Sequence, residues 1–415
     1  MSDHDALLAA ICANPDEDTP RLVFADWLEE HDQPERAAFI RAQVEYARTP
    51  PWEPFAVMCR WRKPDWFTGK PFRNSLPPLD GFHASWPHEP FQRGLGWRLN
   101  LGTPAVWDQI EPRILGRAPV GEIHFHAASH DDWLRFAASA IVPALRKLHF
   151  VSSPIEPMRV LRDTPAALGV TDIHFERAGG AGMPVVLEEL LQSPLGKVVR
   201  GLHFHVGYES LTDLIDALHT GSGLERLSFS VMGLTTDQIR RLCDGPTMAN
   251  LEELSFADEP FGNDGTRVLA GSLPASLRSL RMSSAGGQAD GLEILARSEN
   301  LFGLRRLDLS RNNLAPRAAR VLASSRALAG LRSLNLHGCR IGDKGARRLA
   351  RAKFWMKLVE LDLRGNVISP FGIRNLLDAE MPPDLTALVL DGEQLGIEMR
   401  HELRKKYGER VIFSA

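Results

Sequence analysis

Apolar residues recur along most of the chain in short segments of the form apolar-x-x-apolar-x-apolar, where x is any residue. Close copies begin at Leu145, Leu224, Leu251, Leu277, Leu304, Leu331, Leu358 and Leu385. Looser copies precede and separate them, which gives the central apolar residues Leu99, Ile123, Leu148, Ile173, Leu202, Leu227, Leu254, Leu280, Leu307, Leu334, Leu361 and Leu388. Successive central residues are 24 to 29 positions apart. Because the segments alternate with a period of two, each one predicts a β-strand.

A second landmark with the same period predicts a helix in each unit. Leu269, Leu295, Leu322, Leu349 and Leu376 are 26, 27, 27 and 27 positions apart, in stretches rich in Ala, Leu and Arg. A unit of one strand and one helix cannot bury its own apolar side, so neighbouring units must stack. The pattern therefore predicts an α/β solenoid of about 12 repeats, with a parallel sheet and helices on its outer side.

Three of the repeats, LRRLDLSRNNL, LRSLNLHGCRI and LVELDLRGNVI, follow the pattern LxxLxLxxN/CxL. With their GxxxLA helices, residues 96–415 resemble leucine-rich repeats of the ribonuclease-inhibitor type. The resemblance implies a horseshoe whose parallel sheet lies on the concave side. Asn312, Cys339 and Asn366 occupy the Asn/Cys position, where we expect them to turn inward and satisfy backbone groups. For Cys339 this interpretation is favoured over a reactive thiol.

Residues 1–48 predict a small all-α module instead of repeats. We expect helices over Asp5–Ala13, from Thr19 as N-cap with Pro20 at the first helical position, and from Pro34 onward. The residues predicted to form its core are Leu22, Trp27, Leu28, Phe39, Ile40 and Val44. The stretch NPDEDTPRLVFADWLEEHDQPERAAFIRAQ resembles a bacterial repeat-companion domain that occurs at the N-terminus of repeat proteins. That resemblance implies no activity.

The same module carries most of the net charge. The whole chain has a formal charge of −3, whereas residues 1–48 hold eleven acidic and four basic residues. Asp16, Glu17 and Asp18 form an acidic run that suggests a cation site. The run lacks the spacing of a calcium-binding loop and precedes a helix, where negative charge is favourable. We therefore favour a helix-stabilising role for these three carboxylates.

Residues 49–98 hold nine of the 28 prolines and five of the nine tryptophans. We predict that residues 49–95 form an irregular linker and a cap over the N-terminal end of the repeat core, because the exposed end of a solenoid must be covered. Interleaved aromatic and basic side chains also suit single-stranded nucleic acid, which is the alternative. At the other end, Val411–Phe413 predicts a thirteenth strand within a closing cap.

Histidines recur at one position of four consecutive repeats. Residues on either side of a central apolar residue should face the concave side, and His124, His149, His174 and His203 each follow one. Two positions later, His126 and His205 share that face. The full set of predicted partner-binding residues on the concave face is His124, His126, His149, His174, Glu176, His203, His205, Arg281, Arg306, Asp308 and Arg364.

Three interpretations of this ladder of histidines, His124, His149, His174 and His203, remain open. Duplication of repeats can leave tolerated histidines without a role. The ladder can be a recognition surface for an acidic or aromatic partner, with a pH dependence because neighbouring imidazoles suppress one another's protonation. It can also bind zinc or a similar metal through His124, His126 and His149, since an HxH segment puts two imidazoles on one side of a strand.

The remaining composition favours a binding protein. The near balance of 49 Lys+Arg against 52 Asp+Glu disfavours nucleic acid, and no apolar run is long enough for a membrane span. The sequence contains no CxxC pair, GxSxG or HExxH motif and no phosphate-binding Gly loop. We therefore predict a non-enzymatic, cytoplasmic interaction protein without a cofactor that binds a protein partner on its concave face. The alternatives are a metal-dependent site on the histidines and, by analogy with similar repeat proteins, a GTPase regulator.

Overall fold

The structure is a computed structural model. It describes residues 2–62, 64, 68–79, 84–126, 129–151, 154–177, 182–206, 210–221 and 223–414. The chain divides into two compact units: unit 1 comprises Met1–Pro50 and Arg62–Glu209, and unit 2 comprises Pro51–Trp61 and Ser210–Ala415. The segment Pro51–Trp61 therefore interrupts unit 1 in sequence and contributes to unit 2.

Unit 1 contains strands in the order β1-β4-β5-β6-β7-β8. Their bounds are β1 Ala84–Ser85, β4 Arg98–Leu101, β5 Glu122–Phe125, β6 Lys147–Phe150, β7 Asp172–Phe175 and β8 Gly201–His205. Strands β4 to β8 are parallel, whereas β1 pairs antiparallel with β4. A separate hairpin joins β2 (Phe91–Gln92) to β3 (Leu95–Gly96). The edge strand β4 is thus paired with a strand from the segment that we predicted to form the cap.

Helices follow the strands of unit 1 as the repeat pattern predicts. They are α6 Trp107–Ile114, α7 His130–Ala137, α8 Ile155–Arg162 and α9 Met183–Gln192, with short 3-10 helices η1 Lys70–Ser75, η2 Pro104–Val106, η3 Val142–Ala144 and η4 Pro165–Gly169. The phenylalanines that replace the last leucine of the motif, Phe125, Phe150, Phe175 and Phe204, stack in a buried row with ring centroids 6.1, 6.0 and 5.3 Å apart. In unit 2 the same position holds Phe229 and Phe256, whose rings stack with centroids 5.8 Å apart, and leucine occupies it from Leu309 onward.

The N-terminal module of unit 1 has the three predicted helices: α1 Asp3–Ala13, α2 Thr19–Glu30 and α3 Pro34–Arg48. The predicted N-cap is wrong, because Asp18 occupies that position and Thr19 already lies in the helix. The core cluster contains Ile11, Phe24, Ala25, Leu28, Ala37, Ile40, Val44 and Leu95, with Leu7, Leu8, Leu22 and Trp27 at its margin. Phe39 packs instead against Phe72 and Phe91, at centroid distances of 4.6 and 5.5 Å. This helical module is therefore packed partly by residues from the segment that follows it.

The acidic run of this module forms ion pairs within unit 1. The Asp16 carboxylate accepts a hydrogen bond of 2.8 Å from Nε of Arg146, which lies just before β6. Asp18, with 8% of its surface exposed, pairs with Arg48 at 2.5 Å and Arg93 at 3.6 Å. Two of the three carboxylates that suggested a cation site are thus neutralised by arginines. Their role in the structure is to hold the helices to each other and to the neighbouring repeats of the unit.

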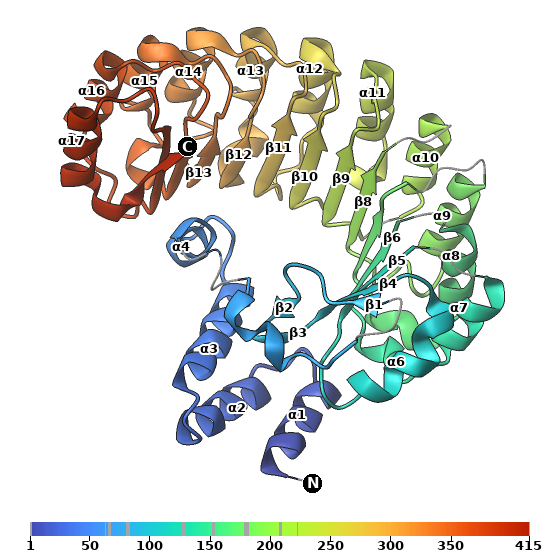
Figure 1. Cartoon of the computed structure of the whole chain (residues 1–415). Helices are drawn as coiled ribbons and strands as arrows, with labels where there is room; N and C mark the ends of the chain where they lie inside the picture. Colours follow the sequence, from blue (N-terminus) through green and yellow to red (C-terminus); the bar gives the residue numbers. More distant parts are fainter. Residues whose placement is uncertain are drawn as a thin grey trace. The chain divides into compact units, whose positions relative to one another are not determined.

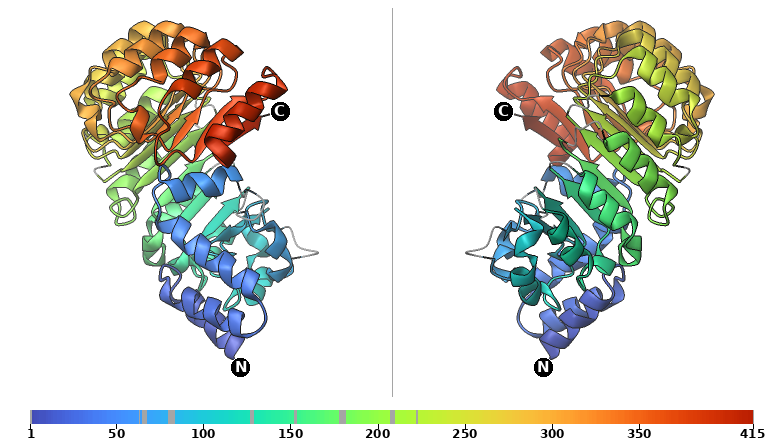
Figure 2. Two further views of the ribbon diagram at one scale, coloured as in Figure 1. Left: turned by 90° about the vertical axis from the view of Figure 1, so that its left-hand side faces the viewer. Right: turned by 90° about the vertical axis from the view of Figure 1, so that its right-hand side faces the viewer.

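Unit 2 contains eight parallel strands: β9 Arg226–Ser230, β10 Glu253–Ala257, β11 Ser279–Ser283, β12 Arg306–Asp308, β13 Ser333–Asn335, β14 Glu360–Asp362, β15 Ala387–Asp391 and β16 Val411–Ser414. Its helices are α10 Leu211–Leu218, α11 Thr236–Asp244, α12 Gly262–Ser272, α13 Ala289–Leu295, α14 Ala315–Ser324, α15 Gly342–Leu349, α16 Pro370–Asp378 and α17 Ile397–Tyr407, with 3-10 helices η5 Pro246–Met248, η6 Glu299–Gly303, η7 Trp355–Lys357 and η8 Gly408–Arg410. Figures 1 and 2 show α11 to α16 on one side of this sheet.

The register of the parallel strands confirms the predicted repeat. Each of the twelve central apolar residues lies on a strand, and the pairing aligns neighbours, such as Leu307 with Leu334 and Leu334 with Leu361. The predicted thirteenth strand is β16. The fold class is therefore α/β, with stacked strand–helix repeats and an N-terminal helical part.

Buried polar side chains bond to the backbone of the loops that follow several strands in unit 2. Asn366, with 1% of its surface exposed, accepts hydrogen bonds from the amides of Cys339 and Ile341, both at 3.0 Å. It donates to the carbonyls of Leu336, Leu363 and Arg364 at 2.7, 2.9 and 3.1 Å. Asn312 and Cys339 are buried in the equivalent position. The predicted structural role of the Asn/Cys position is confirmed by these contacts.

One occupant of this position was missed at the sequence level. Glu259 is five residues after its central leucine, as Asn312 is, and it is fully buried. Its carboxyl accepts hydrogen bonds from the amides of Met232 at 2.6 Å and Leu234 at 2.8 Å. Burial raises the pKa of Glu259 although the backbone donors lower it. An acid can therefore supply the buried acceptor for the loop amides at this position, as an asparagine does.

The loops after strands β8 to β14 have a left-handed backbone four residues past the central position. Seven successive repeats have a positive φ there: Val206, Val231, Asp258, Ser284, Arg311, Gly338 and Gly365. Only the last two are glycine, the residue that adopts this conformation without strain. Val231, at φ 57°, is a β-branched residue in a region that such residues rarely enter.

We expect the substitution Val231→Asn to stabilise the protein by about 1 kcal/mol, because asparagine tolerates the left-handed region and Val231 is 46% exposed. The midpoint of thermal unfolding should rise by about 2–4 °C. The control is Val185→Asn in helix α9, where the valine is 57% exposed and the backbone is helical. A lower unfolding midpoint for Val231→Asn would contradict the assignment of backbone strain at this position.

Candidate functional site: the strand faces of the two units

The side of each sheet opposite its helices, here called the strand face, carries the predicted partner-binding residues. In unit 1 the register pairs His124 with His149, His149 with His174, and His174 with His203. The ring centroids of these pairs are 4.4, 5.5 and 4.0 Å apart. The four histidines, here called the histidine ladder, therefore form a continuous stack across β5 to β8, and each ring is half-buried.

Carboxylates flank the histidine ladder. Nε2 of His124 lies 2.9 Å from a carboxylate oxygen of Glu122, whose other oxygen accepts a bond of 3.1 Å from Arg98. His149 lies 3.5 Å from Glu176, and His203 lies 3.8 Å from Asp172. The predicted residue Glu176 is thus beside the ladder, and its side chain is 33% exposed.

The stack changes the protonation of its inner members. Burial and, to a smaller extent, the charge of His124 lower the pKa of His149 to about 4, although the charges of Glu176 and Glu122 oppose the shift. Burial, followed by His203 and His149, lowers the pKa of His174 to about 2. Burial opposes the ionisation of Glu122, but the hydrogen bond with His124 and the charge of Arg98 lower its pKa to about 2. At neutral pH the inner ladder is uncharged while Glu122 is ionised.

His126 and His205 lie at the ends of this arrangement. His126 follows β5 and His205 is the last residue of β8, and both are exposed. Among the described residues, no group of three or more His, Cys, Asp or Glu side chains is placed to hold a metal ion. The rings of the candidate ligands His124 and His149 lie 4.4 Å apart between centroids at an interplanar angle of 43°. The metal-binding interpretation through His124, His126 and His149 therefore has no support in this geometry.

In unit 2 the strand face of β11 and β12 carries predicted residues of mixed charge. The Arg281 side chain is 53% exposed and lies 3.8 Å from Asp308. Arg306 is half-buried. Asp308 is largely buried, and its carboxylate accepts hydrogen bonds from the Ser310 amide at 2.9 Å and the Asn335 side chain at 3.1 Å. Arg281 is thus the more accessible contact residue, whereas Asp308 is committed to internal bonds.

The strand face of β14 to β16 is covered by a helix from elsewhere in the sequence. This helix, α4 (Pro54–Arg62), lies on the strand side of the sheet, whereas α14 to α16 lie on the other side (Figure 1). Val57 of α4 packs in one buried cluster with Val359, Ala387 and Val389, and Trp61 and Ile412 lie at its margin. The prediction of linker and cap for residues 49–95 did not foresee this contact within unit 2.

Polar contacts fix both ends of α4 on this face. Nη2 of Arg60 donates to Glu360 at 2.9 Å, and the indole nitrogen of Trp61 donates to the other oxygen of that carboxylate. At the other end, Nη2 of Arg332 donates to Glu53 at 3.0 Å. Burial opposes the ionisation of Glu360, but Arg60 and the hydrogen bonds from Ser333 and Trp61 lower its pKa.

Arg364, the last of the predicted partner-binding residues, belongs to this contact. Its guanidinium lies over the Trp61 ring at 5.1 Å from the centroid and donates to Asp362 at 2.6 Å. The structure therefore gives Arg364 an intramolecular partner that the sequence did not suggest. The sequence does contain one indication that this face is covered. Ala387 and Val389 are apolar at strand-face positions where most other repeats carry polar residues.

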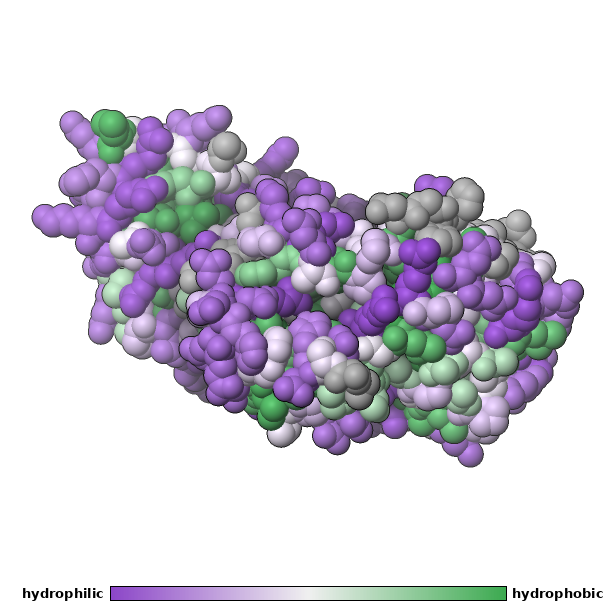
Figure 3. Space-filling view, turned by 60° about the horizontal axis from the view of Figure 1, so that its bottom comes forward, coloured by the Kyte–Doolittle hydropathy of each residue, from purple (hydrophilic) through white to green (hydrophobic). Residues whose placement is uncertain are grey.

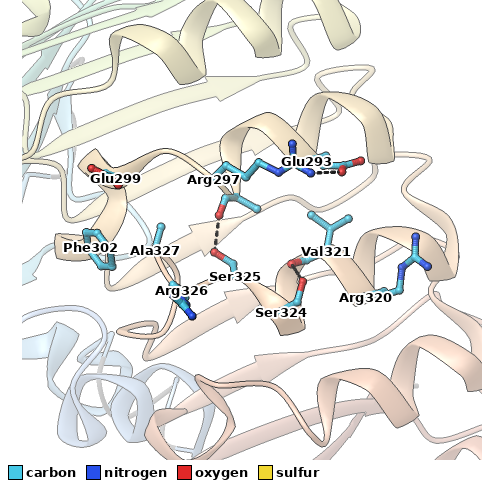
Figure 4. A pocket seen from close by; sticks show the side chains of 11 residues that line it. Glu293, Arg297, Glu299, Phe302, Arg320, Val321, Ser324, Ser325, Arg326 and Ala327 are labelled. Atoms are coloured by element: carbon cyan, nitrogen blue, oxygen red, sulfur yellow. Dashed lines mark hydrogen bonds and ion pairs between the residues drawn. The ribbon is translucent and has the colours of Figure 1, made fainter.

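The hollow drawn in Figure 4 lies on the helix side of unit 2, away from the strand face. Its volume is about 660 Å³, and it is lined by Glu293, Ala296, Arg297, Glu299, Phe302, Arg320, Val321, Ser324, Ser325, Arg326 and Ala327. Arg297 pairs with Glu293 at 2.6 Å, and Ser325 donates to the Ala296 carbonyl at 2.6 Å. The drawn serines bond to backbone carbonyls, so neither is prepared as a nucleophile.

The surface drawn in Figure 3 is mainly hydrophilic, with hydrophobic side chains in small groups. In the described part of the chain, no helix has the length and apolar character needed to cross a membrane. These features agree with contacts through polar faces and give no sign of a large apolar docking patch on the face shown.

Comparisons with known proteins find one repeat family and several distant likenesses among solved structures. A family model described as leucine-rich repeat matches residues 331–350, and no curated protein matches the chain. Among solved structures, the yeast Rad7 and Elc1 complex has a chain 15% identical, with 90% of this chain and 92% of that chain covered and a TM-score of 0.45. An internalin from Listeria monocytogenes is 15% identical over 63% of this chain and 72% of that chain, with a TM-score of 0.38. The matched residues 331–350 contain β13 and the whole of α15, so this strand–helix unit is a leucine-rich repeat.

Proposed function

We propose that the protein is a non-enzymatic, cytoplasmic scaffold that binds a protein partner on its strand faces. The observation that carries the proposal is the docking of α4 on β14 to β16 through apolar, charged and aromatic contacts. A strand face of this chain is therefore compatible with binding a polypeptide. The same proposal assigns the repeats to the ribonuclease-inhibitor type and residues 1–48 to a repeat-companion domain.

Two other parts of the strand faces are candidates for such a partner. In unit 1 the uncharged rings of His149 and His174 lie between the carboxylates Glu122 and Glu176, which suits an aromatic or hydrogen-bonding partner group. In unit 2, Arg281 and Arg306 lie on strands β11 and β12 near the buried carboxylate of Asp308. Alternating charges of this kind favour a protein partner over a polyanion, which would require one sign of charge.

Quantitative affinity capture from cell extract tests this proposal. We expect proteins retained by the wild-type chain to be depleted about tenfold, equivalent to about 1.4 kcal/mol, by His149→Ala with His174→Ala or by Arg306→Ala. The control, Arg240→Ala, removes an exposed arginine of α11 on the helix side, where it pairs with Asp237. Equal retention of the same proteins by all variants would remove the strand faces as the binding surface.

A further inference from the structure

The contacts of helix α4 with unit 2 described above come from one side of the helix, and Ala56 and Cys59 on its other sides are buried as well. The residues that make these contacts are Glu53, Val57, Arg60 and Trp61. Their spacing of i, i+4, i+7 and i+8 is that of residues on one side of an α-helix. The opposing residues come from four consecutive repeats: Arg332, Val359, Glu360, Arg364, Ala387, Val389 and Ile412. We call this second set the helix site.

We propose that the helix site is a binding site for an amphipathic helix of this chemistry, and that α4 is its displaceable internal occupant. A competing partner carries an acidic residue, a β-branched apolar residue, an arginine and a tryptophan at the spacing of α4. The inference deepens the proposed function because it names the chemistry of a partner. Its test uses a synthetic peptide, so it can fail while the proposed function stands, and the reverse also holds.

The helix site differs from an ordinary part of the repeat core. The core between strands and helices is closed by leucines such as Leu361 and Leu388, which point away from α4 and are fully buried. Ala387 and Val389 flank Leu388 on the opposite side of the sheet, and both are also fully buried. Nothing in the repeat itself requires apolar residues there, whereas an occupant on the strand face does.

The charges of the helix site select the direction and register of the occupant. Glu360 accepts from Arg60, Trp61 and Ser333, and it faces the C-terminal end of α4. Arg332 faces the N-terminal end through Glu53 and also pairs with Asp384 at 3.2 Å. An acid at the beginning and an arginine at the end of a helix are also the favourable arrangement for its dipole. A reversed helix would bring like charges together at both ends.

The size of α4 makes release feasible. It has nine residues, fewer than the roughly 12 needed for even marginal stability as a separate helix in water. Its helical form therefore depends on docking. Pro50 and Pro51 precede the helix, and Pro54 is its first residue. Because α4 is part of the chain, its effective concentration at the helix site is on the order of millimolar. A partner helix displaces α4 when the ratio of its concentration to its dissociation constant exceeds the same ratio for α4.

The test measures binding of a fluorescent peptide, PWEPFAVMCRWR (residues 51–62), to the full-length chain under reducing conditions. In the variant Val57→Asp, an added carboxylate enters the apolar cluster beside Glu360, so α4 should leave the site. We expect this variant to bind the peptide at least tenfold more tightly than the wild-type chain. The matched control is Met58→Asp, one position further along and half-buried outside the apolar cluster, which should bind like wild type.

A second substitution tests the site itself. In the Val57→Asp chain, Glu360→Lys should abolish peptide binding, because it turns the acceptor of Arg60 and Trp61 into a repelling cation. Equal binding of the peptide to wild type and Val57→Asp, or binding that survives Glu360→Lys, would overturn the proposal.

Hydrogen exchange of the wild-type chain covers the case in which Val57→Asp does not fold. Amides of residues 54–62 should exchange at least 100-fold faster than those of β13 to β15, and excess peptide should accelerate them further. Protection of α4 equal to that of the strands, unchanged by peptide, would show an integral element and refute displacement.

Discussion

Lowering the pH from 7 to 5 is expected to destabilise unit 1 through its histidine ladder. The pKa values of His149 and His174 are lowered by burial and by neighbouring histidines to about 4 and about 2, from an ordinary 6.5. The unfolded chain takes up protons below pH 6.5, whereas these folded rings do not. Stability is therefore complete above pH 6.5 and declines as the pH falls through the range between 6.5 and the folded pKa values.

The expected loss at pH 5 is about 1–2 kcal/mol for each ring. Between pH 6.5 and pH 5 the unfolded ring binds a proton that the folded ring does not, and this difference over 1.5 pH units costs about 2 kcal/mol. Solvent screening reduces the value for His149, because its side chain is 25% exposed. The groups around the two rings are Glu122, Lys147, Asp172 and Glu176 together with His124, His126 and His203. Because the pKa of Glu122 is lowered to about 2, that carboxylate stays ionised throughout this pH range.

Hydrogen exchange at pH 7 and pH 5, corrected for the intrinsic rates, separates the two units and measures this loss on the amides of β5 to β8. The double variant His149→Asn with His174→Asn should remove most of the pH dependence, since asparagine does not titrate. His401→Asn, an exposed position on α17 in unit 2, should leave it unchanged. A pH dependence that persists in the double variant would place its origin elsewhere.

Replacing Asn366 with alanine is expected to destabilise unit 2 by about 3–5 kcal/mol. The substitution removes the acceptor of two buried amides and the donor to three carbonyls, and each unsatisfied buried group costs about 1–3 kcal/mol before partial relaxation. Asn366→Cys should recover part of the loss, because Cys339 fills the same position one repeat earlier and its thiol lies 3.0 Å from the Leu309 carbonyl.

Urea unfolding, monitored by hydrogen exchange of β13 to β15, measures this effect. Asn375→Ala is the control, because that asparagine is in the same repeat but bonds only to carbonyls of its own helix, Phe371 and Gly372. We expect a cost below about 1 kcal/mol for the control. Similar losses for Asn366→Ala and Asn375→Ala would indicate that the loop bonds contribute little.

The repeats could be predicted in detail because each one repeats a local rule. A strand with apolar residues at a period of two, followed by a helix, needs only its neighbours to bury its core, so the twelve central residues were enough to predict the parallel strands β4 to β15. The histidine ladder followed from the same alignment, since equal positions in successive repeats become neighbours. Glu259 and the left-handed Val231 were not foreseen, because a chemically different residue meets the same local requirement.

The sequence by itself determined the repeat, its strand register, the buried Asn/Cys position and the stacking of four histidines. Only the tertiary structure decided that α4 belongs to unit 2 and occupies the helix site, and how far the pKa values of His149 and His174 are lowered. The physical reason is range. Repeat stacking is set by contacts between adjacent repeats. Helix α4 instead contacts residues about 300 positions away, such as Glu360, and the repeat period does not predict that contact. The pKa values depend on burial and on the spacing of rings, and both exist only once the strands have paired.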